Sequence, residues 1–405
     1  MGIRPFDGVN VLDFTWAGAG PLTVNYLAQY GATVVKVESS SRPDLTRTVP
    51  PYKDGVPGLE NSVYFAACNG AKKLDISLNL NNPRGEELVK RLVSWADVVV
   101  ENFTPGTLEK WGLGYDNLKG INPGIILLRA SGYGQTGPLA RQPVLGYHLT
   151  PVSGLNTFTG WPDRPPTQMH GAYTDLIVPL FAAIALVAAL DYKHRTGNGQ
   201  CLELSQQEAC IHFIGPLVLD AAVNHREPDR TGNRVPDAAP HNVYRCQGNE
   251  RWCAIAVFSD LEWEAFCRVI GKPKLVGDPR FSSILARKRN EDGLDELVER
   301  WTSQRSPEEV MNLMQANGVG AGIVANAQGH AEDPQLKHYR FFQQVEHPTL
   351  GKCGFYHRSG FVLSQAECEV SRPPLLGEHT EYVCTELLGM SDEEFVGLVG
   401  EGVFN

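Results

Sequence analysis

The chain has 405 residues, of which 42% are hydrophobic and 20% are charged, as in an ordinary globular protein. Single hydrophobic cores usually stop growing below this length, so two domains are expected. The net charge of −10 at pH 7 argues against a nucleic-acid partner and against a basic patch for a membrane surface. An anionic ligand would therefore have to be bound by a local group of donors.

The cysteine and histidine patterns exclude several further classes of protein. The nine cysteines form no CxxC pair, which is typical of free thiols in a reducing compartment. The N-terminal segment MGIRPFDGV lacks the apolar core of a signal peptide, so a cytoplasmic protein is expected. The eleven histidines form no HxxH, HExxH or close His/Cys/Asp cluster, so no metal site is expected.

The first part of the chain predicts an open α/β domain with a parallel sheet. A β-rich segment at 9–14 is followed by a glycine turn at 18–21, a helix to Tyr30 and a second strand at 32–37. Strand, turn, helix and strand in this order form a βαβ unit. Further buried strands are predicted at 97–100 and 125–128, with a helix at 83–95 before them.

An apolar segment near the middle of the chain predicts a central helix. It carries no charge between Asp175 and Asp191, which implies burial on every side. About fifteen apolar residues are fewer than the roughly 20 needed to span a membrane, so a helix inside a soluble protein is expected. The turn at 196–200 predicts a helix C-cap leading into a strand at 201–205. A second long helix is predicted at 206–223.

From Asn224 the composition becomes polar and proline-rich, which indicates a linker. The three predicted domain segments are 1–224, a smaller α/β domain at 225–330, and a C-terminal segment at 331–405 that returns to the first domain. In the smaller domain we predict strands at 243–246, 252–257 and 323–325, and helices at 261–270, 291–303 and 307–316.

Two glycine-rich turns are candidate ligand sites. Gly18, Ala19 and Gly20 resemble the start of a dinucleotide fingerprint, and Glu38 follows strand two where a ribose-binding acid would stand. Thr23 occupies the place of the third glycine, which favours a phosphate- or adenosine-binding turn of another kind over an NAD site. The loop at 131–135 follows a predicted strand, at the end where open α/β sheets bind ligands.

Asp175, at the start of the central helix, has two interpretations. Aspartate is a favoured helix N-cap, and the residues alone favour this role. The alternative uses the same physics, because helix N–H groups and the helix dipole would keep the carboxylate ionised at neutral pH. An ionised carboxylate in a dry site can be a nucleophile toward an activated acyl group. Both interpretations stay open at this point.

A series of segments in order along nearly the whole chain resembles the class III CoA-transferase family. This family also contains formyl-CoA:oxalate transferase, carnitine CoA-transferase and α-methylacyl-CoA racemase. Any one segment would be a weak signal, but so many in the same order are specific. They are residues 8–21, 31–38, 96–106, 113–115, 131–138, 175–200, 278–281, 333–336, 347–348 and 376–380.

The resemblance implies a Rossmann-like large domain built from both chain ends, a smaller α/β domain, and an interlocked dimer. The partner would be a second copy of the chain or a homologous subunit. It also implies that Asp175 is the nucleophile, through mixed anhydrides and an aspartyl-CoA thioester. Coenzyme A would enter as a thioester substrate, with no tightly bound cofactor.

The resemblance also implies which residues contact the substrates. Asn102, Phe103 and Lys110 would contact CoA, and Ala17 and Gly18 would approach the thioester. Tyr133 and Gly134 of the glycine-rich loop complete the predicted contacts.

Two departures from the formyl-CoA branch favour a substrate bulkier than oxalate. Gly18 stands where that branch has a glutamine, and a glycine run expected near 240–244 is absent. The chain is most similar to succinyl-CoA-dependent members, including those acting on (R)-benzylsuccinate in anaerobic aromatic degradation. A dicarboxylate needs a cation for its distal carboxylate, and Arg47 and Arg234 are the candidates.

Two other functions are open. The first is an acyl-CoA racemase, in which His148 would pair with Asp175. The setting of His148 differs from the racemase pattern, so a structural or substrate-contacting role is favoured. The second is a non-catalytic CoA-binding partner subunit, against which the retention of Asp175 argues.

Overall fold

The computed structural model describes residues 4–169 and 171–405, and these form two compact units. The first unit extends to Asn156 and takes in Gln168–Glu227 and Pro334–Asn405, so it is assembled from both ends of the chain. The second unit comprises Thr157–Thr167 and Pro228–Asp333.

Residues 157–167, predicted to belong to the first domain, are part of the second unit instead. Gly232 lies against the ring of Trp161, where an added Cβ would be 2.4 Å from the nearest ring carbon. Arg230 Nε also donates to the carbonyl of Trp161 at 3.3 Å. These contacts connect two segments that are far apart in sequence, which the local residue pattern does not reveal.

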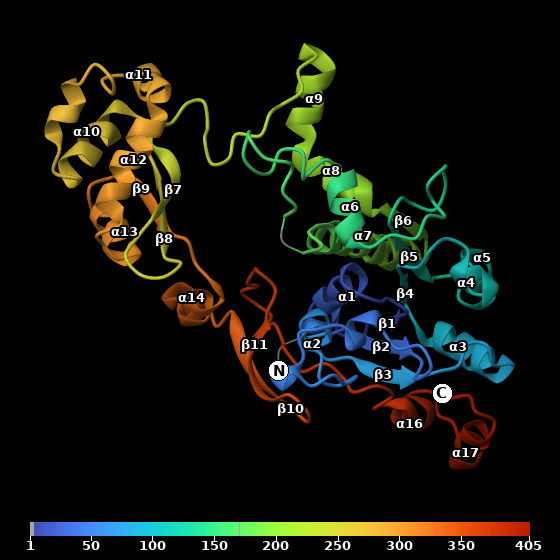
Figure 1. Cartoon of the computed structure of the whole chain (residues 1–405). Coiled ribbons are helices and arrows are strands. Elements are labelled where there is room, and N and C mark those ends of the chain that lie inside the picture. Colours follow the sequence, from blue (N-terminus) through green and yellow to red (C-terminus); the bar gives the residue numbers. More distant parts are fainter. Residues whose placement is uncertain (1–3, 170) are drawn as a thin grey trace. The chain divides into compact units, whose positions relative to one another are not determined.

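The first unit is built on a six-stranded parallel sheet with the strand order β3-β2-β1-β4-β5-β6 (Figure 1). This is the Rossmann order, in which β1 lies at the point where the order reverses. The strand β3 was not predicted, because LDIS is short and follows two lysines. The strands are β1 Asn10–Asp13, β2 Thr33–Glu38, β3 Leu74–Ser77, β4 Val98–Glu101, β5 Ile126–Ser131 and β6 Cys201–Ser205.

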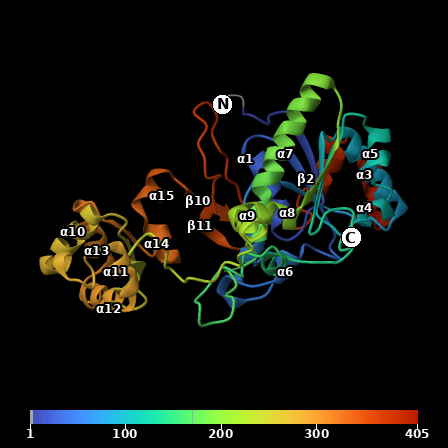
Figure 2. The ribbon, with the colours of Figure 1, turned by 90° about the horizontal axis from the view of Figure 1, so that it is seen from above.

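Helices cover both faces of this sheet, which explains why its strands are apolar throughout. On β1, Val11 faces α1 and α7, whereas Leu12 faces α3, α5 and the C-terminal helices. Figure 2 shows α1 and α7 side by side. The helices of this unit before the linker are α1 Ala19–Gln29, α2 Val63–Cys68, α3 Pro83–Trp95, α4 Thr107–Lys110, α5 Tyr115–Ile121, α6 Gly146–Val152, α7 Thr174–Thr196, α8 Gln206–Ile211 and α9 Gly215–Asn224.

The helix α7 is buried on one side only, which corrects the prediction of burial on every side. Ala182, Leu186 and Ala189 pack in the core with α1 and the sheet. The opposite face is exposed at Leu176, Leu180, Ile184 and Val187, with Ile184 70% exposed. By length and composition α7 could cross a membrane, but its packing against α1 and α8 makes it a core helix.

The predicted helix at 206–223 is broken into α8, a 3₁₀ turn at His212–Ile214, and α9. Pro216 occupies the first turn of α9 and has no N–H for the preceding helical turn. By contrast, the predicted C-cap after α7 is present. Gly197 has a φ of 75° and its N–H donates to the carbonyl of Lys193.

The C-terminal segment packs on the face of the sheet that α3 and α5 also cover. Val383, Leu398 and Val403 belong to the same core as Leu12 and Val35. His379 Nδ1 accepts from the backbone N–H of Asp75 in β3 at 3.2 Å. The elements are α15 Pro334–His338, the antiparallel pair β10 Phe342–His347 and β11 Gly351–His357, α16 Thr380–Tyr382 and α17 Asp392–Gly400.

The second unit contains a three-stranded antiparallel sheet and has its own core around Trp263, Phe266 and Val298. Ser306 begins α13 by accepting from the N–H of Glu309, with Pro307 as the first helical residue. The elements are β7 His241–Arg245, β8 Trp252–Ala256, α10 Asp260–Val269, α11 Ile284–Arg289, α12 Glu291–Thr302, α13 Pro307–Ala316, β9 Gly320–Ile323 and α14 Ala327–Glu332.

Candidate active site

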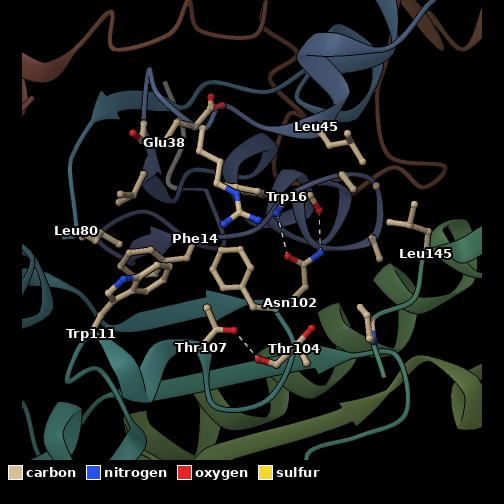
Figure 3. Close-up of a pocket in the computed structure, with 18 of the residues that line it drawn as sticks. Phe14, Trp16, Glu38, Leu45, Leu80, Asn102, Thr104, Thr107, Trp111 and Leu145 are labelled. Atoms are coloured by element: carbon tan, nitrogen blue, oxygen red, sulfur yellow. Dashed lines mark hydrogen bonds between the residues drawn. The ribbon is translucent and has the colours of Figure 1, made fainter. Parts of the chain in front are cut away.

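A cavity of about 650 Å³ lies at the carboxyl ends of the parallel strands (Figure 3). Its lining includes Phe14 after β1, Ser39 after β2, Leu78 after β3 and Asn102 after β4. Open α/β sheets bind ligands at this edge, where the strand order reverses. The topology of the first unit therefore accounts for the position of the cavity.

One wall of the cavity combines aromatic rings with two cations. The ring of Phe103 lies edge-on to Trp16 and Trp111, at centroid distances of 5.5 and 5.9 Å. The guanidinium of Arg42 lies 5.5 Å from the Trp16 ring centroid, and Lys110 also lines the cavity. Within the described residues neither cation forms an ion pair with a carboxylate, so both are free to bind phosphate groups.

Asp175 enters the same cavity from the first turn of α7 and lies between two glycines. A Cβ added to Gly18 would lie 2.8 Å from Asp175 Oδ2, and one added to Gly146 would lie 2.7 Å from Oδ1. Neither glycine has a positive φ, so available space, not backbone conformation, favours glycine at both positions. The two glycines let two backbone segments enclose the carboxylate.

Asp175 does not cap its helix, which corrects the capping interpretation. The N-cap position of α7 is Tyr173, and the Asp175 carboxylate accepts no hydrogen bond from the described residues. Burial alone raises the pKa of Asp175 to about 7. Burial therefore opposes the expectation that the helix terminus keeps this carboxylate ionised at neutral pH, because it raises the pKa instead of lowering it.

The predicted nucleophile and five of the predicted contact residues line this cavity, and the other predicted contact residues do not. Asn102 lines it, but both polar atoms of its amide bond the backbone of Trp16 (Figure 3). Gly132 lines the cavity, whereas its predicted neighbours Tyr133 and Gly134 lie outside the lining. The six residues are Ala17, Gly18, Asn102, Phe103, Lys110 and Asp175.

His148 does not share the cavity with Asp175. It is exposed on α6, and its Nδ1 accepts from the backbone N–H of Leu145 at 3.3 Å. This bond caps the start of α6. A structural role for His148 agrees with this geometry, and the pairing with Asp175 that a racemase needs is absent from the described residues.

Arg47 is wrong as a candidate for binding substrate. It is fully buried and pairs with Glu38 and Glu60, both at 2.8 Å, while its guanidinium lies 3.6 Å from the Phe65 ring centroid. These contacts occupy its donors, and they also occupy Glu38, the residue at the ribose-binding position. Arg234 belongs to the second unit and pairs there with Asp292 and Asp295, so its substrate role stays a prediction.

Sequence reasoning missed Arg42, Gly146 and Trp111, which all line the cavity. Arg42 could have been found, because it lies in the loop that follows β2, at the ligand-binding end of the sheet. Gly146 has no such signal, since its importance depends on the approach of α6 to α7.

The sequence matches CoA-transferase family III over residues 6–380. The chain belongs to this family. It is 32% identical to succinyl-CoA–D-citramalate CoA-transferase of Chloroflexus aurantiacus, covering 99% of this chain and 98% of that protein. It is 31% identical to human succinyl-CoA:glutarate CoA-transferase, covering 99% and 90%. It is therefore a class III CoA-transferase, which uses CoA thioesters as substrates.

The solved structure of a CAIB/BAIF family protein from Brucella suis has the same fold. It superposes with a TM-score of 0.87 at 31% identity, covering 96% of this chain and all of that chain. The mixed α/β architecture with its parallel six-stranded sheet thus matches the fold of that CAIB/BAIF family protein.

The raised pKa of Asp175 predicts a pH-dependent reaction. If the ionised carboxylate reacts, the reactive fraction rises from about one in ten at pH 6 to about nine in ten at pH 8. The rate at which acyl-CoA modifies the enzyme should follow this curve, with a midpoint near the folded pKa of about 7. Stopped-flow release of CoA from pH 5.5 to 8.5 measures it, and a rate that is constant over this range contradicts the assignment.

The same pKa makes Asp175 costly to stability above neutral pH. An unfolded aspartate has a pKa of about 3.9, so folding favours its protonated form up to pH 7, and stability falls as pH rises through this window. Asp175→Asn removes this loss. The difference between the folded and unfolded pKa implies that the variant is more stable at pH 8 by up to a few kcal/mol. Thermal unfolding of both proteins at pH 4 and pH 8 gives the comparison. If the variant gains no stability relative to the unsubstituted protein as pH rises, the carboxylate is not desolvated.

Proposed function

We propose that this enzyme moves CoA from succinyl-CoA to an organic acid by covalent catalysis on Asp175. The observation that carries this proposal is the Asp175 carboxylate itself. It lies in the cavity between Gly18 and Gly146 and accepts no hydrogen bond from the described residues. A desolvated carboxylate without a partner is more nucleophilic than a hydrated one once it is ionised.

The first half-reaction exchanges one activated acyl group for another. A carboxylate oxygen of Asp175 attacks the thioester carbonyl, the C–S bond breaks, and CoA leaves as a thiolate. This forms an anhydride between Asp175 and the succinyl group. The thiolate then attacks the aspartyl carbonyl, and succinate leaves with one of the aspartyl oxygens. The enzyme now holds CoA as an aspartyl thioester.

The second half-reaction runs in the opposite direction with a different acid. The acceptor carboxylate attacks the aspartyl thioester and releases the thiolate, forming a new anhydride. The thiolate attacks the acceptor carbonyl, giving the product thioester and restoring the Asp175 carboxylate with one oxygen from the acceptor. No proton or ATP is consumed, but water must be excluded because anhydrides and thioesters hydrolyse.

The relatives support succinyl-CoA as donor and a dicarboxylic acid as acceptor. Two similar proteins are named as succinyl-CoA transferases to D-citramalate and to glutarate. The (R)-benzylsuccinate proposed from the sequence is also a substituted dicarboxylate, and it belongs in the same acceptor panel. Gly18 leaves more space beside the acyl group than the glutamine expected for oxalate.

The two alternative functions, racemase and non-catalytic subunit, have less support than CoA transfer. A racemase needs a second acid or base facing Asp175, and no histidine is found among the described residues that line the cavity. A non-catalytic subunit would not need a carboxylate in the cavity.

Trapping tests the covalent step. After incubation with succinyl-CoA, hydroxylamine should convert Asp175 to a hydroxamate, which peptide mass spectrometry locates. Asp175→Ala should remove the modification and reduce transfer by at least about 10⁴-fold while the fold is kept. Glu203→Ala, which removes a carboxylate outside the cavity, is the control and should leave both unchanged. Modification at another residue, or substantial transfer by Asp175→Ala, would contradict the covalent mechanism.

Arg42 is proposed to bind a CoA phosphate beside the Trp16 ring. Arg42→Ala should raise the KM for succinyl-CoA about tenfold or more with kcat largely kept, because the contact is equal in ground and transition states. The control Arg141→Ala removes the same charge from an exposed loop residue outside the cavity lining. Equal KM effects in steady-state kinetics of the two variants would mean that only the overall charge matters.

We also propose that the exposed face of α7 is covered by a second subunit, in the interlocked dimer expected from the sequence. Leu176, Leu180, Ile184 and Val187 follow a helical spacing and expose large apolar side chains together. Ile184→Glu should shift the sedimentation coefficient of the purified chain toward a monomer. Leu261→Glu, in the second unit and 78% exposed, is the control. A monomeric unsubstituted chain would exclude a homodimer and favour a homologous partner subunit.

A further inference from the structure

The turn between β1 and α1 brings Gly18 against the Asp175 carboxylate. Within this turn Ala17 has a φ of 63°, a left-handed conformation that residues with a Cβ rarely adopt. Such a conformation persists only when the surrounding structure holds it, and it is common where strain serves a site. The contacts that hold this turn therefore decide where Gly18 lies.

Asn102, the residue that follows β4, holds the middle of the turn. Its Oδ1 accepts from the N–H of Trp16 at 2.9 Å, and its Nδ2 donates to the carbonyl of Trp16 at 2.8 Å. The dashed lines in Figure 3 mark this reciprocal pair. The amide thus bonds both the N–H and the carbonyl of Trp16. A paired residue in a neighbouring β-strand would form the same two hydrogen bonds.

Buried charged residues also hold other parts of the turn. Asp44 Oδ1 accepts from the N–H of Ala17 at 3.1 Å. Lys36 Nζ donates to the carbonyl of Thr15 at 2.7 Å and to Asp44 Oδ2 at 3.2 Å. Asp44 and Lys36 are both fully buried, so this ion pair is a fixed support below the turn.

We infer that Asn102 and Asp44 are positioning residues for the transfer reaction. They hold the strained turn so that Gly18 encloses the carboxylate of Asp175 on one side. This inference rests on the proposed nucleophilic role of Asp175. It assigns to the Asn102 side chain a function other than the CoA contact expected for it.

The two roles of Asn102 differ in their kinetic effects. A side chain that binds CoA contributes equally before and during reaction, so its loss raises KM and leaves kcat unchanged. A side chain that positions the turn acts on the geometry of the reacting carboxylate. Displacing a reacting group by about 1 Å can lower the rate about a hundredfold.

Asn102→Ala is the test, because it removes a neutral amide at the half-buried edge of the cavity and leaves no buried charge unpaired. We expect kcat for succinyl-CoA to fall about tenfold or more with a smaller change in KM, and the pH midpoint of CoA release to shift. Hydrogen exchange in the peptide that covers residues 14–22 should become faster. Asn102→Asp keeps the acceptor for the Trp16 N–H and should recover part of kcat.

Asn117→Ala is the matched control, since Asn117 lies outside the cavity lining and its side-chain amide donates to the carbonyl of Gly112 instead of to the turn. It should change neither kcat nor the exchange of residues 14–22. A raised KM with unchanged kcat and unchanged exchange in Asn102→Ala would overturn the positioning role. That result would leave the covalent mechanism intact, because hydroxylamine would still trap Asp175 in the unsubstituted enzyme. Failure to trap Asp175 in the unsubstituted enzyme would refute the covalent mechanism itself.

Discussion

The enclosed carboxylate of Asp175 is the constraint on which the rest of the site depends. Two backbone segments approach it so closely that glycine is required at both positions, 18 and 146. The enclosure partly desolvates the carboxylate, and this burial raises its pKa to about 7. The same removal of water would protect an acyl anhydride or thioester from hydrolysis. The cost to stability and the protection of the intermediate thus have one physical cause.

The parallel sheet supplies the geometry for this enclosure. Its carboxyl edge collects the loops after every strand, so the turn that carries Gly18 and the loop that carries Arg42 meet on one cavity. The first turn of α7 lies at the same cavity and adds Asp175 from a distant part of the sequence. Buried ion pairs support the loops at this edge. Lys36 with Asp44 supports the turn after β1, and Arg47 with Glu38 ties the segment after β2 back to that strand.

Much of the fold could be predicted from the sequence, because local patterns determine it. The strand at 201–205 and the helix at 83–95 were predicted with the observed bounds, since apolar runs and a proline at the first helical position define them. The break in the helix after Ile211 was missed, although Gly215 and Pro216 mark it. The exposed face of α7 could not be predicted, because an apolar surface looks the same in sequence whether the core or another subunit covers it.

The site was predicted less completely, because a sequence does not show which charged residues pair or which segments pack against a side chain. Asp175 was found through its resemblance and spacing, but its raised pKa depends on two glycines that approach from other elements. Arg47 was mistaken for a substrate ligand because a sequence does not show that Glu38 and Glu60 already occupy it. Asn102 lies where expected, yet its bonds to Trp16 appear only in three dimensions.

The central claim is that an oxygen of Asp175 takes part in each transfer. It is tested most directly by incubating the enzyme with succinyl-CoA and succinate labelled with ¹⁸O in its carboxylates. Each complete exchange leaves one succinate oxygen on the aspartate, so the peptide that contains Asp175 should gain about 2 Da and, after repeated turnovers, about 4 Da. Omitting succinyl-CoA should leave the peptide unlabelled. Turnover of succinyl-CoA with no ¹⁸O in Asp175 would contradict the account.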